Sequence, residues 1–423
     1  PPLFSSRRRN TRFLHRSRGL GDVYKRQVPE RHLREAARKL LLEAPPVHRA
    51  SFIERLSYSA PLRPLLARVF RQQVAKRAAQ RHYPAPYAMI DVWRKHAGDK
   101  AGMLRAEAES LASLVTGPTA KNLVRVFFLQ EQLKSLGKDK TYRPTHVHVI
   151  GAGTMGGDIA AWCALRGFNV TLQDQAPERI APAMARASKL FRRKLKQPVK
   201  VTAAMDRLMP DHRGHGVGKA DIVIEAIFED AEVKRSLYKV IEPRMKAGSI
   251  LATNTSSIPL EELTPALQQP ERLVGLHFFN PVAKMMLVEI VNGASTSAEV
   301  SAQAMTFTRQ IDRLPLPVTS TPGFLVNRIL MPYLMEAVVL EAEGVPAVLI
   351  DQAATDFGMP MGPVELADTV GLDICLHVAE VLADHFNAEI PERLTKLVAD
   401  GKLGKKSGTG FYAWKKGKAV KPK

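Results

Sequence analysis

The sequence contains little cysteine, and its two cysteines are far apart. Among 423 residues only Cys163 and Cys375 are cysteine. They do not form the closely spaced pairs of zinc sites and redox motifs. An isolated thiol in a reducing compartment usually packs as a small apolar side chain, whereas secreted proteins accumulate disulfides. The cysteine content therefore favours a cytoplasmic protein without a disulfide framework.

Long apolar runs and several catalytic motifs are also missing. No apolar run approaches the roughly 20 residues that cross a bilayer, so no membrane span is expected. There is no H-E-x-x-H motif, and His212 and His215 stand in a glycine-rich loop. Neither G-x-S-x-G nor G-x-x-x-x-G-K-[ST] occurs. The sequence therefore predicts no metal site, no serine-hydrolase motif and no P-loop.

Acidic residues are scarce relative to basic ones. The chain has 62 Lys and Arg against 41 Asp and Glu, a formal charge of +21. The excess is concentrated in residues 1–27, with eight basic residues and one acid, and in the C-terminal lysines. A basic balance favours phosphate-bearing partners such as nucleic acid, coenzyme A or dinucleotides. Because aromatic interleaving and recognisable nucleic-acid motifs are missing, we expect no nucleic-acid partner.

Residues 1–27 differ from the rest of the chain, and three interpretations are open. The segment could be a non-native cloning scar, a mitochondrial-type transit peptide or a nucleic-acid-binding arm. Residues 28–143 are expected to be helical, with a break at residues 83–86. Apolar residues recur there at helical spacing, as in Leu111–Leu114–Val115 and Leu123–Val126–Phe127. This segment has no site of its own, as if a domain had lost its beginning, and that favours the scar.

From His146 the sequence predicts strands alternating with helices. The expected strands are residues 146–150, 169–174, 220–227, 249–255, 272–279 and 287–291. Such alternation favours an α/β fold with a parallel, doubly wound sheet of the Rossmann type. Strands are expected to stop at Thr321, after which the chain forms a smaller all-helical domain. The predicted domains are therefore a non-native or disordered segment 1–27, a helical segment 28–143, a dinucleotide-binding domain 144–320 and a helical domain 321–423.

A glycine motif follows the first predicted strand and opens a helix. Gly151, Gly153 and Gly156 form G-x-G-x-x-G in that context. Its first glycine permits a tight turn, the second lets the backbone approach a pyrophosphate, and the third lets helix and strand pack closely. Asp174 ends the next strand, 23 residues after Gly151, where an acid binds ribose hydroxyls and repels a 2′-phosphate. The motif predicts NAD as the cofactor.

Polar residues at predicted strand ends are candidates for catalysis. His277 lies near the end of an apolar strand, and Glu289 interrupts the next one. A buried carboxylate needs a partner, and pairing with a histidine also fixes the ring tautomer. A catalytic pair, a structural ion pair and a solvent-facing Glu289 all remain possible here. Ser256 is either a site residue or a helix cap before Pro259, and Asn327 a site residue or a polar surface position.

These motifs resemble one family in the order in which they occur. The segments VIGAGTMGGDIA, VIEAIFEDAEVK, TNTSSI, GLHFFNP, LVEIV, TPGFLVNRIL, GMPMGPVELADTVGLD and GKKSGTGFY resemble the 3-hydroxyacyl-CoA dehydrogenases from about Thr145 to Trp414. Residues 28–143 are similar to the end and linker helix of the enoyl-CoA hydratase half of the bacterial fatty-acid oxidation complex α-subunit. YPAP and NLVRVFFLQEQLKSLGK carry that second resemblance.

The resemblance implies an activity, NAD-dependent oxidation of (S)-3-hydroxyacyl-CoA to 3-ketoacyl-CoA in fatty-acid β-oxidation. His277 matches the catalytic base, Glu289 its orienting carboxylate, and Ser256 and Asn327 the contacts to the substrate 3-oxygen. Cofactor-contacting positions match the set Met155, Asp174, Glu229, Lys234, Ser256 and Asn280. The alternatives are a dehydrogenase of small β-hydroxyacids, which would usually use a catalytic lysine, and a non-catalytic relative with a binding role.

The resemblance also implies partners and shows departures. We expect an acyl-CoA substrate, a homo-oligomer or a complex with a thiolase subunit, and no hydratase activity. The location would be mitochondrial only if residues 1–27 were a transit peptide. Ala283 and Met286 stand where the family pattern has His and Pro. Both lie between His277 and Glu289, so the geometry of that loop is what a structure must test.

Overall fold

The computed structural model describes residues 28–43, 56, 59–139, 141–386 and 389–421. Residues 1–27, to which the three interpretations above apply, lie outside the described residues. The chain divides into two compact units between Gly117 and Pro118. The domain boundaries expected at 143/144 and 320/321 stay predictions. Within the described residues, no helix combines the length and apolar character needed to cross a membrane.

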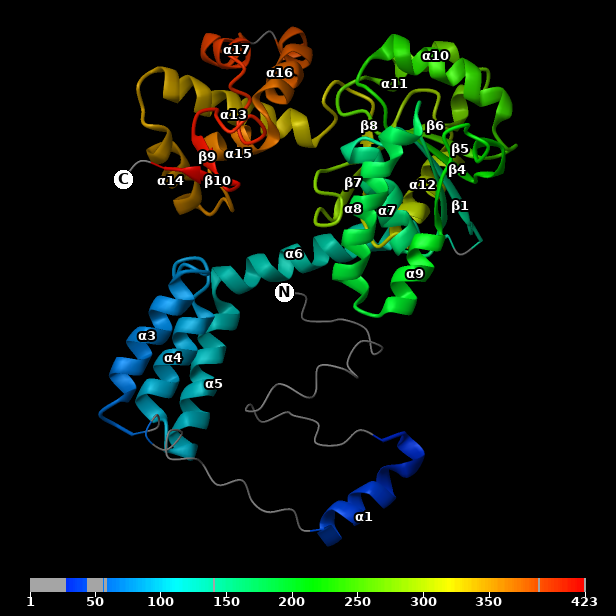
Figure 1. Cartoon of the computed structure of the whole chain (residues 1–423). Coiled ribbons are helices and arrows are strands. Elements are labelled where there is room, and N and C mark those ends of the chain that lie inside the picture. Colours follow the sequence, from blue (N-terminus) through cyan, green and yellow to red (C-terminus); the bar gives the residue numbers. More distant parts are fainter. Residues whose placement is uncertain (1–27, 44–55, 57–58, 140, 387–388, 422–423) are drawn as a thin grey trace. The chain divides into compact units, whose positions relative to one another are not determined.

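The first unit is helical, as expected (Figure 1). Its helices are η1 (Glu30–His32), α1 (Leu33–Glu43), α3 (Arg63–Ala75), α4 (Ala85–His96) and α5 (Lys100–Thr116). Helix α4 begins within the Tyr83–Pro86 break, and Asp99 caps α5 by accepting a hydrogen bond from the Gly102 N–H. Helix α4 packs against α3 and α5, with Tyr87 and Ile90 buried.

The second unit contains an eight-stranded sheet in the order β3-β2-β1-β4-β5-β6-β7-β8. Its strands are β1 (His146–Ile150), β2 (Asn169–Gln173), β3 (Leu208–Pro210), β4 (Ile222–Glu225), β5 (Ile250–Thr253), β6 (Leu273–Phe278), β7 (Leu287–Asn292) and β8 (Leu314–Thr319). Parallel pairing dominates, which confirms the Rossmann-type fold class.

The sheet corrects two expectations. Strand β7 runs antiparallel to β6, because only residues 279–286 connect them and a parallel crossover needs a dozen or more residues. Strand β8 was not predicted, since it contains Pro315 and Pro317 and therefore reads as a loop. The two prolines are tolerated because β8 lies at the edge of the sheet, where backbone N–H groups on the outer side of the strand need no strand partner.

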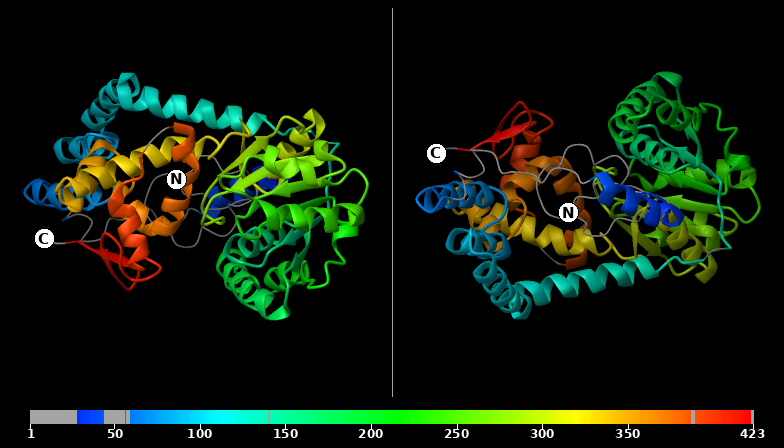
Figure 2. Two further views of the ribbon diagram at one scale, coloured as in Figure 1. Left: turned by 90° about the horizontal axis from the view of Figure 1, so that it is seen from above. Right: turned by 90° about the horizontal axis from the view of Figure 1, so that it is seen from below.

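Helices cover both faces of this sheet (Figure 2). The helices that pack on it are α7 (Thr154–Leu165), α8 (Pro177–Leu195), α9 (Pro198–Asp206), α10 (Ala231–Ile241), the single turn α11 (Leu260–Leu263) and α12 (Ala298–Gln310). Helix α6 (Pro118–Ser135) precedes β1 and buries none of its residues. Short 3-10 turns are η2 (Val217–Lys219), η3 (Glu242–Arg244), η4 (Thr264–Ala266) and η5 (Pro270–Arg272).

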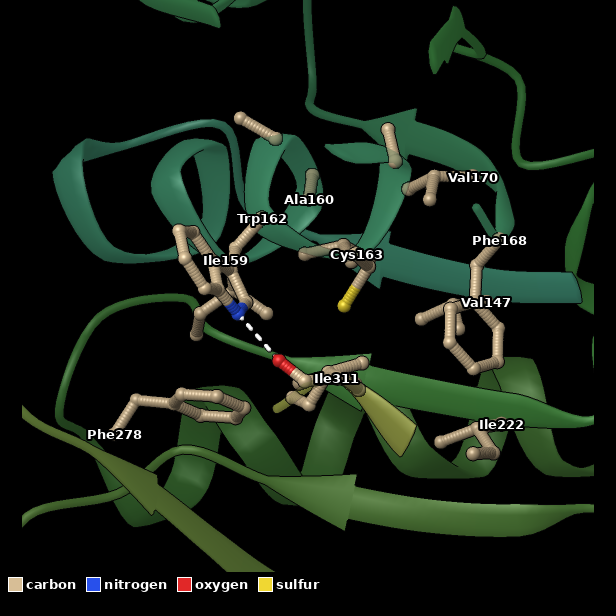
Figure 3. Packing of buried hydrophobic residues seen from close by; sticks show 14 of the residues in the cluster. Val147, Ile159, Ala160, Trp162, Cys163, Phe168, Val170, Ile222, Phe278 and Ile311 are labelled. Carbon is tan, nitrogen blue, oxygen red and sulfur yellow. Dashed lines mark hydrogen bonds between the residues drawn. The ribbon is translucent and has the colours of Figure 1, made fainter. Parts of the chain in front are cut away.

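Each face of the sheet has its own apolar core because side chains alternate along a strand. Val147 and Val149 of β1 pack into one cluster with α7 and α12, and Ile150 packs into the other with Tyr238 of α10. Figure 3 shows the first cluster, in which the Trp162 indole donates a hydrogen bond to the Ile311 carbonyl at 2.8 Å. These cores fix the strand ends on which the candidate site stands.

The C-terminal region is helical, with one departure from the expected all-helical domain. Its helices are α13 (Val326–Ala342), α14 (Ala347–Phe357), α15 (Pro363–Val370), α16 (Leu372–Phe386) and α17 (Glu392–Ala399). An antiparallel hairpin, β9 (Ala413–Lys415) and β10 (Lys418–Val420), follows them. Its two-residue turn, Lys416–Gly417, has positive φ at both positions, as favoured hairpin turns require.

Buried carboxylates explain why such short strands are stable there. Asp368 is fully buried and accepts hydrogen bonds from the Phe411 and Tyr412 N–H groups and from the Trp414 indole, each at 2.9 Å. Asp351 accepts from the Tyr412 hydroxyl at 2.8 Å. The hairpin is therefore attached to α14 and α15 by side-chain acceptors, which a search for strand periodicity does not detect.

A buried histidine makes the stability of the sheet depend on pH. His148 of β1 is fully buried, and its ring nitrogens bond to the Thr171 hydroxyl and the Gln173 amide oxygen, both at 2.8 Å. Burial lowers the pKa of His148 to about 4, although Asp211 at 3.9 Å opposes the shift. Between pH 6.5 and 4 the unfolded chain therefore binds a proton that the folded chain does not.

We expect the free energy of unfolding to fall as the pH is lowered through this window. His148 alone should remove about 2 kcal/mol between pH 7 and pH 5, because its stabilising effect is complete only above the unfolded pKa. Denaturant unfolding of the wild type and of His148→Gln, at both pH values, measures the difference. Equal pH dependence in the two proteins would contradict the assignment.

Candidate active site

The glycine turn after β1 has the geometry that its sequence predicted. Gly151 has φ of +104°, and a Cβ there would collide with the Ala226 carbonyl oxygen. A Cβ on Gly156 would collide with the Gly151 carbonyl oxygen, whereas a Cβ on Gly153 would meet nothing within 4 Å. Helix α7 begins directly after Gly153, with no side chain capping it. Its first N–H groups can therefore bind a phosphate in the space beside Gly153.

Asp174 lies beside this turn. Its carboxylate accepts hydrogen bonds from the Ala152 and Gln175 N–H groups, both at 2.7 Å. Met155, in the first turn of α7, is partly buried against the core. Arg186 of α8 donates to the Gly153 carbonyl at 2.8 Å, which brings a guanidinium to the rim of the turn. Sequence reasoning did not find Arg186, because its position depends on how α8 packs on α7.

His277 and Glu289 form a buried pair across the antiparallel strands. They are direct register partners in β6 and β7, and His277 Nδ1 lies 2.6 Å from Glu289 Oε2. Glu289 is fully buried and His277 is 6% exposed, so the solvent-facing alternative for Glu289 is wrong. Nδ1 donates to the carboxylate, and Nε2 makes no hydrogen bond within the described residues. The free nitrogen can accept a proton.

The second oxygen of Glu289 binds the start of helix α13. Oε1 accepts hydrogen bonds from the Leu325 N–H at 3.0 Å and the Val326 N–H at 2.9 Å. These donors belong to the positive end of the helix, which favours a carboxylate there. The Glu289 carboxylate therefore accepts three hydrogen bonds, one from His277 of β6 and two from the start of α13, and a buried charge is stable only with such partners.

Ser256 and Asn327 contact each other beside this pair. The Asn327 side-chain amide donates to the Ser256 carbonyl at 3.0 Å, and Asn327 is partly buried in the first turn of α13. The Ser256 hydroxyl and N–H donate to Glu229 at 3.0 and 2.6 Å. Helix α11 begins at Leu260, and Ser256 makes no cap to it. The helix-cap alternative for Ser256 is therefore wrong, whereas Asn327 is a partly exposed amide whose site role stays a prediction.

Lys234 and Glu229 extend the same network toward the sheet. Lys234 is 1% exposed, and its ammonium lies 3.4 Å from Glu229 Oε2 and 2.7 Å from Glu225 Oε1. Glu225, the last residue of β4, was not singled out from the sequence. The signal was present, because a carboxylate ends the apolar run Ile222–Ile224 just as Glu289 interrupts its own strand. Asn280 is exposed in the loop after β6.

The departures at Ala283 and Met286 leave the His277–Glu289 pair intact. A buried arginine, Arg313, supports this loop by donating to the Val282 carbonyl at 2.6 Å. Its guanidinium stacks 3.6 Å above the Trp162 ring, and Met286 Sδ lies 3.7 Å from Nη1. Ala283 packs against the apolar core. The loop is thus stabilised by Arg313, from a different element.

The site residues therefore gather at the carboxyl ends of the parallel strands, where open α/β sheets bind ligands. The glycine turn and Asp174 follow β1 and β2. One hydrogen-bonded group contains His277 and Glu289, a second contains Asn327, Ser256, Glu229 and Lys234, and the backbone at the start of α13 joins the two. No hydrogen bond joins Asn280 to this network among the described residues. In that same part of the chain, no three His, Cys, Asp or Glu side chains are arranged to bind a metal ion.

Comparison with known proteins identifies one family for both parts of the second unit. The NAD binding domain of 3-hydroxyacyl-CoA dehydrogenase matches residues 146–321, and its C-terminal domain matches residues 323–414. The chain is 36% identical over 361 residues to a fatty acid oxidation complex subunit alpha from a Psychrobacter species, covering 82% of this chain and 50% of that protein. The chain thus spans about half the length of the curated relatives it matches.

Solved structures give the same result. The (S)-3-hydroxybutyryl-CoA dehydrogenase of Ralstonia eutropha is 34% identical with a TM-score of 0.62, covering 65% of this chain and 100% of that one. The 3-hydroxybutyryl-CoA dehydrogenase of Escherichia coli is 37% identical with a TM-score of 0.62, covering 66% of this chain and 61% of that one. These matches confirm the family and the NAD cofactor predicted from the motifs. The roles of individual residues stay predictions.

Substitutions at two glycines of the turn should have different effects, one on cofactor binding and the other on folding. Gly153→Ala should leave thermal unfolding unchanged, because φ is −60° and the added methyl meets no protein atom. It should weaken NADH binding about tenfold, because the methyl enters the space left for the pyrophosphate. Gly156→Ala should instead destabilise the fold by about 1–3 kcal/mol. NADH fluorescence titration and thermal unfolding of both variants test this, and Gly153→Ala binding NADH normally would contradict it.

Proposed function

The chain belongs to the 3-hydroxyacyl-CoA dehydrogenase family and is an NAD-dependent dehydrogenase, and on this premise we propose that it oxidises (S)-3-hydroxyacyl-CoA to 3-ketoacyl-CoA. The observation that carries the proposal is the buried His277–Glu289 pair with Nε2 unoccupied. A neutral imidazole held in one tautomer is a suitable general base for an alcohol. The catalytic alternative for these two residues thereby gains support over a purely structural ion pair.

The residues present fit the cofactor. The turn leaves space at Gly153, the first N–H groups of α7 have no side-chain cap, and Asp174 stands at the end of β2. Gly151, Gly153, Gly156, Met155 and Asp174 would bind the adenosine and pyrophosphate half. Glu229, Lys234, Ser256 and Asn280 are proposed as the remaining contacts. When bound, the nicotinamide accepts the hydride that leaves C3 of the substrate.

The protein's own residues handle the proton. His277 Nε2 accepts it from the 3-hydroxyl group as the C3–H bond breaks, so the oxygen becomes a carbonyl. Glu289 stabilises the resulting imidazolium, to which it is already hydrogen bonded at 2.6 Å. Ser256 and Asn327 orient the 3-oxygen, a step in which small displacements cost much rate. In the reverse direction the imidazolium returns the proton to the oxygen of the 3-ketoacyl group.

The names of the curated relatives support a wider proposal. They are subunits of a fatty acid oxidation complex, so we place this dehydrogenase in fatty-acid β-oxidation, in association with a second copy or with another subunit such as a thiolase. A cytoplasmic location is also proposed. It is supported by Cys163 and Cys375, which are free, buried thiols of the kind expected in a reducing compartment.

The substrate class is tested with NADH and a series of 3-oxo compounds. We expect rapid NADH oxidation with 3-ketoacyl-CoAs of graded chain length, starting from acetoacetyl-CoA. Oxidation of free β-hydroxyacids with NAD should be slower by orders of magnitude. The protein should be assayed with and without residues 1–27. Faster turnover of the free acids than of the CoA thioesters would favour a small-acid dehydrogenase instead.

Removal of the base should separate chemistry from cofactor binding. His277→Ala should lower kcat by about 10²–10⁴-fold, the usual contribution of a general base, while the NADH dissociation constant stays within about a factor of two. Glu289→Gln should also lower kcat, because the imidazolium loses its counter-charge. His96→Ala, in the first unit, is the matched control and should retain full activity. Normal turnover by His277→Ala would exclude the proposed mechanism.

A further inference from the structure

Glu225 is a completely buried carboxylate at the end of β4. Each of its oxygens accepts two hydrogen bonds. Oε1 accepts from the Lys234 ammonium at 2.7 Å and the Ile227 N–H at 2.8 Å. Oε2 accepts from the Thr253 hydroxyl at 2.8 Å and the Tyr238 hydroxyl at 3.0 Å. Burying an ionised carboxylate in an apolar strand is costly without hydrogen-bond partners, and these four donors offset that cost.

Three of these four donors belong to segments that carry expected site residues. Lys234 is itself one of them. Ile227 lies in the loop that leads from β4 to Glu229. Thr253 ends β5, directly before the turn that contains Ser256, and it is the register partner of Glu225. Glu225 therefore connects the ends of two neighbouring strands with the first turns of α10.

Lys234 links Glu225 to Glu229, the next carboxylate toward the Ser256 turn. Its ammonium is 1% exposed and lies between Glu225 Oε1 at 2.7 Å and Glu229 Oε2 at 3.4 Å. A buried ammonium needs a close counter-charge, and the shorter of these two distances is to Glu225. Removing the charge of Glu225 would leave Lys234 dependent on Glu229, which already has other partners.

Glu229 in turn binds the Thr255–Ser256 turn that follows β5. Its Oε1 accepts from the Thr255 hydroxyl at 2.7 Å, the Ser256 N–H at 2.6 Å and the Ser256 hydroxyl at 3.0 Å. Burial raises the pKa of Glu229, but the Lys234 ammonium and these hydrogen bonds outweigh it and leave the pKa below its usual value. Glu229 is therefore an anion at neutral pH. Lys234 lies at Oε2 of the carboxylate whose Oε1 binds Ser256, so a shift of Lys234 toward Glu229 would move the group that orients Ser256.

We propose that Glu225 is a positioning residue of the active site, which sets the affinity for the nicotinamide cofactor by fixing Lys234 between two carboxylates. The proposal rests on the proposed function in one respect, the expected contact of Lys234 and Glu229 with the cofactor. Glu225 itself is completely buried, so it can act on a ligand only through its neighbours. Its effect is exerted through Lys234 and, through Glu229, on the Ser256 turn.

Glu225→Gln removes the charge with little disturbance of the hydrogen bonds. The amide oxygen can face the Lys234 ammonium and the Ile227 N–H, which can only donate. The amide nitrogen can face Thr253 and Tyr238, whose hydroxyls can rotate to accept. We expect a folded variant whose NADH dissociation constant rises about tenfold, with a smaller change in kcat at saturating NADH. Binding is measured by NADH fluorescence without acyl-CoA, so the outcome does not depend on which substrate is turned over.

Two controls distinguish positioning from general stability. Tyr238→Phe removes one donor to Oε2 but leaves the Lys234 pair, so it should lower thermal stability and leave NADH affinity unchanged. Glu242→Gln alters another buried carboxylate of the second unit, which accepts from the Gln268 and Gln269 N–H groups at 2.8 Å. It should likewise reduce stability alone. Weaker NADH binding in these controls, to the same degree as in Glu225→Gln, would overturn the proposal.

A double-mutant cycle tests the route through Lys234. If Glu225 acts through Lys234, the pair Glu225→Gln and Lys234→Met should bind NADH no more weakly than Lys234→Met alone. Additive losses, or normal NADH affinity in Glu225→Gln, would overturn the proposal. Glu225→Asp decides the matter if the glutamine variant does not fold, because the shorter side chain retracts the charge from Lys234. An NADH dissociation constant within a factor of two of wild type would then overturn it.

Discussion

The candidate active site depends on the hydrogen bonds that the Glu289 carboxylate accepts. One oxygen binds the His277 ring, and the other binds the first N–H groups of α13. The same charge therefore fixes the tautomer of His277 and the start of the helix that carries Asn327. Because Glu289 is fully buried, neither contact can be replaced by water. The sheet and the helical region consequently share one acceptor, and the site is complete only when both are folded around it.

Antiparallel pairing of β6 and β7 makes this contact possible. Direct partners in an antiparallel ladder have side chains on the same face, so His277 and Glu289 meet without any intervening element. A parallel crossover would have placed a helix between them. The short connection also explains why Ala283 and Met286 do not disturb the pair, since the strand register, and not the loop sequence, sets its geometry. Arg313, directly before β8, also holds the loop by donating to the Val282 carbonyl. The loop conformation therefore does not depend on its own sequence alone.

The sequence predicted what local patterns determine. The glycine turn, the parallel order of the first strands and the burial demanded by Glu289 follow from spacing and from the cost of a buried charge. Strand β8 and the β9–β10 hairpin were missed, because prolines conceal the first and carboxylates from other helices stabilise the second. Glu225 gave the same local signal as Glu289. Its partner could not be inferred, since Lys234 reaches it only through the packing of α10 on the sheet.

The network around the candidate site carries more negative than positive charge, although the chain as a whole carries an excess of +21. Within the network, Glu225 and Glu229 face Lys234, and Glu289 faces His277 and a helix terminus. Each of these carboxylates has its hydrogen-bond donors in place within the protein, so the proposed reaction, in which charge develops at the 3-oxygen, would need little reorganisation. Lysines and arginines outside this network can attract phosphate-bearing ligands from a distance. They are not part of the network, in which three carboxylates, Glu225, Glu229 and Glu289, face the ammonium of Lys234 and the ring of His277. The charges that would attract a ligand and the charges that would act in the proposed reaction therefore belong to different sets of residues.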